Sequence, residues 1–324
     1  MICRRRFSAA ALVLHVCAGA IPAAAQDYPS RPIRALTATS AGGTSDIFMR
    51  VVGEEMQKRW GQPIVVENRP GGSMTIGGRA CAEAPNDGYT ICILPVETLA
   101  YNQFLFKKIP YDPERDFAPI TNPFFNTQVL VVSTALKVST LDELAALSKA
   151  KSGTLSYTVP SVPLGLFMDE WKKATGGDLV KVPFKGGGEA VNGVLSGTTP
   201  VAFFGLGNWL PHIRSGAVKA LAVDGDARSP LMPEVPTLRE LGYRGPLTRV
   251  YFGIVAPAGT PAPIIARLHD EIARIGSDAG FRQKRLIEMG LEPVFDTPEA
   301  FARFLKEDRA RSQRIVNEAG YIPQ

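Results

Sequence analysis

The sequence predicts an α/β protein with two units, each a mostly parallel sheet covered by helices. Strand-like apolar runs alternate with helix-like runs from Ile33 to Leu94, and again from Val129 to Val223. Such alternation is typical of parallel sheets flanked by helices. A leader-like stretch of 25 residues is followed by 299 others, which is enough for two ordinary domains.

The N-terminus has the composition of an export signal. Three arginines at positions 4–6 precede an apolar stretch from Ala9 to Ile21, and three small residues end at Ala25. The stretch is shorter than the ~20 residues that span a bilayer, so we expect cleavage after Ala25 and a signal peptide at residues 1–25. Its removal lowers the formal charge from +5 to +2, and no basic run with aromatics follows, so we expect no nucleic-acid partner.

The first unit begins with two strand–helix steps. We expect strands at Ile33–Ala38, Ile64–Val66 and Tyr89–Leu94, with helices at Ile47–Trp60 and from the turn at 69–73 to about Ala84. The first helix has apolar residues at helical spacing. Pro85 and Gly88 end the second helix.

The second unit continues the pattern. We expect strands at Val129–Val132, Leu155–Val159, Leu179–Phe184, Pro200–Phe204 and Lys219–Val223, with helices at Leu141–Ala150, Leu164–Thr175 and Glu189–Leu195. The apolar run Tyr251–Ala256 would return the chain to the first sheet. Three helices then follow at Pro261–Ile275, Asp278–Met289 and Pro298–Ala319, the last with Thr297 as its N-cap.

The turn after the first strand is a candidate anion site. It comprises Ser40, Ala41, Gly42, Gly43, Thr44, Ser45 and Asp46. Glycines at a strand-to-helix turn leave backbone N–H groups free, and the helix dipole adds partial positive charge. A carboxylate or a phosphate would suit such a turn. The alternative is a plain connection in which Asp46 caps the helix.

Cysteine and histidine content limits the remaining chemistry. Only Cys81 and Cys92 follow the leader, and a disulfide and a buried thiol pair both remain open. His212 and His269 are not at metal-ligand spacing, so we expect no metal and no cofactor. No nucleophile–base constellation is present in the sequence, so we expect no enzyme.

Seven segments in order carry a family resemblance. They are YPSRPIR (28–34), AGGTSD (41–46), GQPIVVENRPG (61–71), DGYT (87–90), PYDPERDFAPI (110–120), VPFKGGG (182–188) and APAGTP (256–261). With these segments the chain resembles the extracytoplasmic solute receptors of tripartite tricarboxylate transporters, also called Bug proteins. Each segment is weak alone, but the ordered set spans nearly all of the chain after the leader.

The resemblance implies a two-domain periplasmic binding protein of type II, the Venus-flytrap kind. Domain 1 would be residues 26–128 plus 251–324, and domain 2 residues 129–250. A monomer in the periplasm would capture a small carboxylate in the cleft and pass it to membrane transporter subunits. The alternatives are a ligand sensor for a signalling system and, with less support, a periplasmic enzyme.

The resemblance also implies the binding residues. On this basis we expect ligand contacts from Ser40, Ala41, Gly42, Gly43, Thr44, Asp46, Gly72, Ser73, Met74, Glu97, Thr98, Pro160, Ser161, Phe204, Gly205 and Asn208. Loops at the carboxyl ends of parallel strands converge on one crevice, which favours contacts from the three turns of the first unit, at 40–46, 72–74 and 97–98. Asp46 would repel a ligand carboxylate, so ordering of the loop is its more plausible role.

Three positions depart from the family pattern. Glu97 stands where small residues are usual, and it either faces the cleft or, slightly favoured, points to solvent. The segment 159–165 has two prolines in place of a loop rich in glycine and serine, and proline removes backbone donors. Phe203 reads as core, whereas Phe204, Asn208 and Trp209 are open. We therefore expect a monocarboxylate or an aromatic acid rather than a tricarboxylate.

Overall fold

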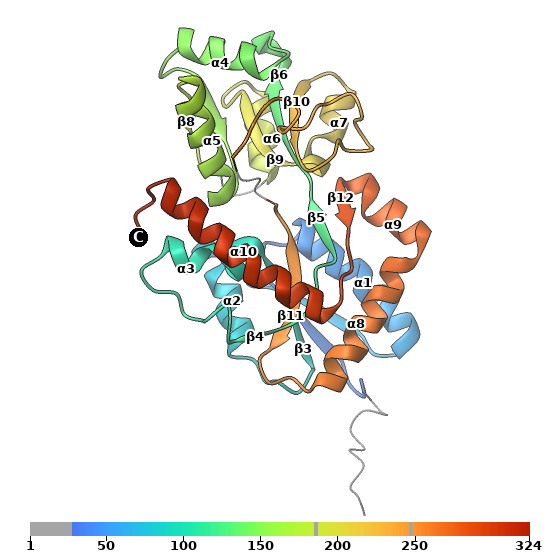
Figure 1. Cartoon of the computed structure of the whole chain (residues 1–324). Helices are drawn as coiled ribbons and strands as arrows, with labels where there is room; N and C mark the ends of the chain where they lie inside the picture. Colours follow the sequence, from blue (N-terminus) through green and yellow to red (C-terminus); the bar gives the residue numbers. More distant parts are fainter. Residues whose placement is uncertain (1–27, 185–186, 246–248) are drawn as a thin grey trace, which may run out of the picture.

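The computed structural model describes residues 28–184, 187–245 and 249–324; the expected signal peptide lies outside these described residues. The chain forms two lobes, each with one five-stranded sheet and flanking helices (Figure 1). Lobe 1 is built on the sheet β2-β1-β3-β11-β4, and lobe 2 on the sheet β10-β6-β9-β7-β8. Within the described ranges, no helix has the length and apolar character that a membrane span requires.

Lobe 1 takes both ends of the described chain. Its elements are β1 (Ile33–Thr37), α1 (Thr44–Trp60), β2 (Ile64–Asn68), α2 (Thr75–Ala82), β3 (Thr90–Pro95), α3 (Asn102–Leu105), β4 (Phe117–Thr121), β5 (Phe124–Asn126), β11 (Phe252–Pro257), α8 (Ala262–Ser277), α9 (Ala279–Arg285), β12 (Leu291–Pro293) and α10 (Pro298–Glu318). Strand β1 pairs in parallel with β2 and β3. The carboxyl ends of these three strands therefore lie at one edge of the sheet.

Lobe 2 holds the middle of the chain. Its elements are β6 (Gln128–Ser133), α4 (Leu141–Ala150), β7 (Ser156–Thr158), α5 (Val162–Thr175), β8 (Val180–Lys181), α6 (Gly187–Leu195), β9 (Val201–Gly205), α7 (Leu210–Arg214) and β10 (Val218–Asp224). Its core includes Phe203, which is fully buried against Phe167 at 4.9 Å between ring centroids. The prediction that Phe203 is a core residue is confirmed.

In each sheet one strand runs against the other four, so the prediction of mostly parallel sheets is confirmed. In lobe 1, β11 runs antiparallel to β3 and β4. In lobe 2, β6 runs antiparallel to β10 and β9. Each of these strands enters its lobe from the other lobe, so its direction follows from the crossing and not from a βαβ step.

The two crossings between lobes lie side by side. The chain leaves lobe 1 at Thr127, between β5 and β6, and returns just before β11. The N–H of Asn126 donates to the carbonyl of Val250 at 2.8 Å, and Phe125 forms a β-bridge with Tyr251. Two paired strands thus connect the lobes, which is the arrangement expected of a hinge.

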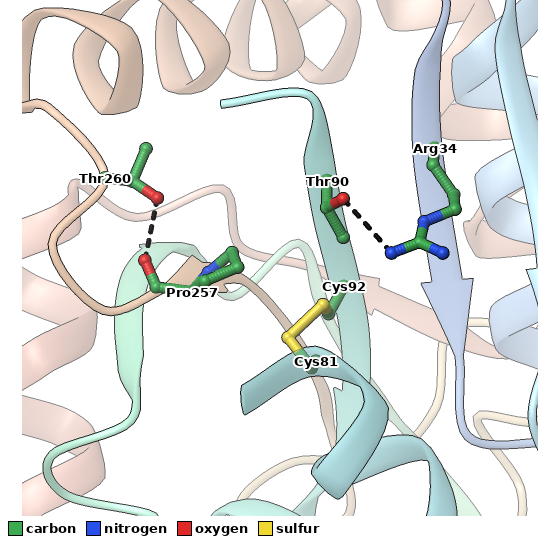
Figure 2. The surroundings of a disulfide bond; sticks show 6 residues. All are labelled: Arg34, Cys81, Thr90, Cys92, Pro257 and Thr260. Atoms are coloured by element: carbon green, nitrogen blue, oxygen red, sulfur yellow. Dashed lines mark hydrogen bonds between the residues drawn. A yellow bond between two sulfur atoms is a disulfide. The ribbon is translucent and has the colours of Figure 1, made fainter. Parts of the chain in front are cut away.

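A disulfide joins Cys81 at the end of α2 to Cys92 in β3 (Figure 2). Both residues are fully buried. The structure thereby decides between the disulfide and the thiol pair that the sequence left open. The bond ties α2 to the strand that leads to Glu97.

Candidate functional site

Hydrogen bonds join the three loops at the carboxyl edge of the lobe 1 sheet. Asn68, at the end of β2, donates to the carbonyl of Thr39 and to the carboxylate of Asp46, both at 3.1 Å. Asn102 donates to the carbonyl of Ser73 at 2.9 Å, and Thr98 donates to that of Met74 at 3.3 Å. The loops after β1, β2 and β3 therefore form one connected surface.

Helix α1 begins with only half of a capping box. Asp46 accepts from the N–H of Gly42, the residue before the cap position, at 2.9 Å, which is a variant of the backward bond that such a box makes to the cap residue itself. The cap position is Gly43, which has no side chain to accept from the first turn. The N–H groups of Thr44, Ser45 and Asp46 have no intrahelical acceptor there and no side-chain cap.

The start of α4 shows the complete motif for comparison. Glu143 accepts from the N–H of Ser139 at 2.6 Å, and its own N–H donates to the hydroxyl of Thr140 at 3.1 Å. Glu143 and Asp46 are both third in their helices. The missing cap in α1 thus leaves donors on a loop whose residues Ser40–Gly42 are exposed. This arrangement suits an anion.

Asp46 acts within the loop. Its side chain is 4% exposed and forms an ion pair with Arg50 at 2.9 Å. Burial raises the pKa of this carboxyl, but hydrogen bonds from Arg50, Gly42 and Asn68 outweigh burial and hold the pKa below its usual value. An ionised carboxylate engaged on every side orders the turn, as the sequence reasoning favoured.

The second turn has an unusual backbone. Gly71, Gly72, Ser73 and Met74 have φ angles of 112°, 55°, 52° and 71°. Such values are costly for Ser73 and Met74, because a Cβ atom crowds the following carbonyl. Ser73 is exposed and Met74 half-buried. The bonds from Thr98 and Asn102 hold this strained turn, and strain that surrounding contacts maintain is typical of functional loops.

Glu97 is buried, contrary to the interpretation that the sequence slightly favoured. It follows β3 as the first residue of a π-helical turn, Glu97–Tyr101, and is 6% exposed. Burial raises the pKa of its carboxyl, while its own backbone N–H and the Ser161 hydroxyl oppose that effect. Ser161 belongs to lobe 2, so these two predicted site residues meet across the lobe boundary.

Helix α5 presents the lobe 2 side of this boundary. Its N-cap is Ser161, whose side chain makes no capping bond, and Pro163 in its first turn has no N–H. The Ser161 hydroxyl is buried and makes no hydrogen bond of ordinary geometry with a described residue. Pro160 is exposed just before it. Apart from Ser161, this side offers few donors.

The remaining three predicted residues lie apart from that set. Phe204 is 4% exposed and packs on Trp209 at 4.8 Å between ring centroids, so its side chain belongs to the lobe 2 core. Gly205 follows it, and a Cβ on Gly205 would meet the side chains of Asn126 and Asn208. Asn208 is exposed and donates to the carbonyl of Gly205 at 3.1 Å. Gly205 and Asn208 therefore lie beside the crossing.

Sequence reasoning missed the two asparagines that connect the loops. Asn68 and Asn102 lie 34 positions apart, and neither stands in a motif that suggests ligand contact. Asn68 lies just before a segment that was predicted to be a turn. Asn102 follows a π-helical turn, and no local sequence signal marks such a turn.

Two cavities lie elsewhere. One of about 300 Å³ is bounded by α5, by Tyr243 and by the end of α10. Another, of about 830 Å³, lies between the end of α1 and α8 in lobe 1. Neither has a predicted site residue in its lining.

Among the described residues, no group of three or more histidine, cysteine, aspartate or glutamate side chains is placed to hold a metal ion.

Comparison with known proteins gives the family. Residues 48–321 match the model of the tripartite tricarboxylate transporter family receptor. BugT of Bordetella pertussis is 33% identical over 308 residues, which is 93% of each chain. The R. palustris protein Rpa4515, solved with adipate, is 28% identical with a TM-score of 0.85, over 92% of this chain and all of that one. MatC from Rhodopseudomonas palustris, solved with malate, is 28% identical with a TM-score of 0.79, over 89% of this chain and all of that one.

These matches bear out the resemblance drawn from the seven segments and the two-domain binding-protein fold that it implied. The matched family consists of receptors, and the similar structures are of binding proteins, so the protein is a solute receptor rather than an enzyme. By its sequence and its fold, the chain belongs to the tripartite tricarboxylate transporter receptor family, the Bug proteins.

Proposed function

We propose that this receptor captures a small organic acid between its lobes in the periplasm and delivers it to the membrane subunits of a tripartite transporter. The observation that carries the proposal is the uncapped start of α1. There, free N–H groups face an exposed loop at the carboxyl edge of the sheet. A ligand carboxylate would complete the cap that Gly43 lacks.

The proposed closure uses the paired strands at the crossing. We propose residues 26–128 plus 251–324 as one domain and residues 129–250 as the other. The change of sheet at Thr127 supports the first boundary, and the start of β11 at Phe252 supports the second. Closure about these strands would bring α5 and Ser161 onto a ligand seated on lobe 1.

The relatives support the ligand class. Adipate and malate, bound in the two R. palustris structures, are both dicarboxylates, so they support a small carboxylate ligand in general and not the single carboxylate. The donors on α1 suit one carboxylate, whereas the buried carboxyl of Glu97 would repel a second negative charge placed beside it. We therefore keep the proposal of a ligand with a single carboxylate, such as an aromatic acid, over a tricarboxylate.

A thermal-shift screen of the purified mature protein tests the proposal. The panel contains monocarboxylates, dicarboxylates, tricarboxylates, aromatic acids and amino acids. A ligand that binds only the folded protein must raise the melting temperature. At a concentration 100 times its Kd it adds about 2.7 kcal/mol to the free energy of unfolding. Calorimetry then ranks the hits. Tight binding of citrate without binding of benzoate-like acids would overturn the ligand class, and no shift with any acid would overturn the function.

Transport needs a separate experiment. Uptake of the identified ligand into vesicles that contain the cognate membrane subunits should depend on added receptor. Ligand-dependent activation of a sensor kinase, without such uptake, would favour the sensory alternative. Size-exclusion chromatography with light scattering checks the proposed monomer.

A further inference from the structure

The Glu97 carboxyl is an isolated acid at the lobe boundary. Its residue is 6% exposed, and it opens the π-helical turn directly after β3. π-helical turns of this kind occur often at functional sites. Among residues 28–184, 187–245 and 249–324, no lysine, arginine or histidine forms an ion pair with Glu97 or lowers its pKa by its charge.

The groups that face Glu97 supply no positive charge. Tyr101, on the same turn, and Tyr111 both have raised pKa values, chiefly from burial and in part from the Glu97 charge. From lobe 2 comes Ser161, whose hydroxyl is buried and makes no ordinary hydrogen bond with a described residue. A buried carboxylate among neutral groups is destabilised unless a cation or a proton reaches it.

Glu97 and the proposed carboxylate site follow neighbouring strands of the lobe 1 sheet. Glu97 follows β3, whereas the uncapped turn of α1 follows β1, and these two strands are paired neighbours in parallel register. Adjacent strands lie about 4.8 Å apart and their carboxyl ends share one edge of the sheet, so we infer that a short ligand can reach both groups. One end of the ligand would meet the free N–H donors, and the other would meet the buried acid and the Ser161 hydroxyl beside it.

We propose that Glu97 and Ser161 form a subsite for the ammonium group of an amino acid whose carboxylate binds at the start of α1. The inference rests on the proposed function and narrows its ligand class to short zwitterions. The ammonium supplies the charge that Glu97 lacks and can also donate to the hydroxyl of Ser161. An amino acid with a neutral side chain still carries a single carboxylate, in agreement with the ligand class proposed above; aspartate in the panel below tests whether a second one is tolerated.

Isothermal titration calorimetry with matched pairs at pH 7 tests this subsite. The pairs are alanine with propionate, 4-aminobutyrate with butyrate, leucine with 4-methylpentanoate, phenylalanine with 3-phenylpropionate, and aspartate with succinate. At least one amino acid should bind about tenfold or more tightly than its partner without nitrogen, because a buried charge-assisted bond is lost with the ammonium. If every acid binds as well as its amino acid, the subsite is refuted and the receptor function stands. If nothing in the panel binds, both fail.

Two variants localise the effect. Glu97→Gln keeps the size of the side chain and should abolish the preference for the amino acid while binding of the plain acid is kept or improved. Glu54→Gln, an exposed position in α1, is the control and should keep the preference unchanged. Ser161→Ala should reduce the preference a few-fold, and it serves as the second variant if Glu97→Gln fails to fold. A preference that Glu97→Gln leaves in place, or that Ser161→Ala leaves unchanged, would overturn the assignment of the ammonium to these residues.

Discussion

Replacement of Gly43 by serine gives the sharpest prediction for the α1 turn, because it would supply the missing cap. The backbone at Gly43 has φ −73° and ψ 163°, the extended conformation of N-cap residues. A serine hydroxyl there can accept from the N–H of Ser45 or Asp46. Those are donors that we assign to the ligand carboxylate, so the cap and the ligand should compete.

Gly43→Ala is the matched control, since it adds the same Cβ without the hydroxyl. That Cβ would lie 3.1 Å from the Ser40 carbonyl and from the Thr39 hydroxyl, so both variants carry the same crowding. A serine cap is worth about 1 kcal/mol over alanine, which corresponds to roughly 1.5–2 °C in melting temperature for a chain of about 300 residues. Gly43→Ser should therefore melt above Gly43→Ala.

Ligand binding should change in the opposite direction. A hydrogen bond to a charged group is worth about 1.5–3 kcal/mol, so its loss predicts a roughly tenfold or greater fall in affinity of Gly43→Ser relative to Gly43→Ala. Calorimetry with the ligand found by screening measures this ratio, and thermal melts measure stability. Equal affinities of the two variants, with Gly43→Ser the more stable, would refute a carboxylate site at the start of α1.

Three further predictions concern the supports of the site. Asp46→Asn should lower the free energy of unfolding by about 2 kcal/mol at neutral pH, where the lowered pKa keeps Asp46 ionised. A denaturant titration measures this loss, which should shrink as pH falls through that pKa. The control is Glu143→Gln at an exposed position of α4, which should lower the free energy of unfolding less. Replacing Cys81 and Cys92 together by serine should cost about 3 kcal/mol by loop-closure entropy; unchanged melting of the oxidised parent and the double variant would contradict the disulfide. Glu97→Gln should raise the melting temperature at pH 8 but not at pH 4. Burial raises the pKa of Glu97, so ionisation at high pH destabilises the folded parent protein and not the variant. Equal gains in melting temperature at both pH values would argue against this cause.

Much of the fold could be predicted because local patterns specify it. Helix α4 has the predicted bounds Leu141–Ala150, and Thr297 caps α10 by accepting from the N–H of Ala300 at 3.2 Å. These features depend on residues within one or two turns. Strands β4 and β12 were missed because they are short and contain proline, which argues against strands when only the local sequence is considered.

The sequence by itself determined the family, the two-lobed α/β class and the glycine turn before α1, because each depends on order or spacing along the chain. Only the tertiary structure decided that the sheets are mixed, that Phe204 packs into a core, and that Glu97 is buried against Ser161 of the other lobe. The physical reason is the distance in sequence between contact partners. Glu97 and Ser161 are 64 positions apart, so their environment arises only when the two lobes come together.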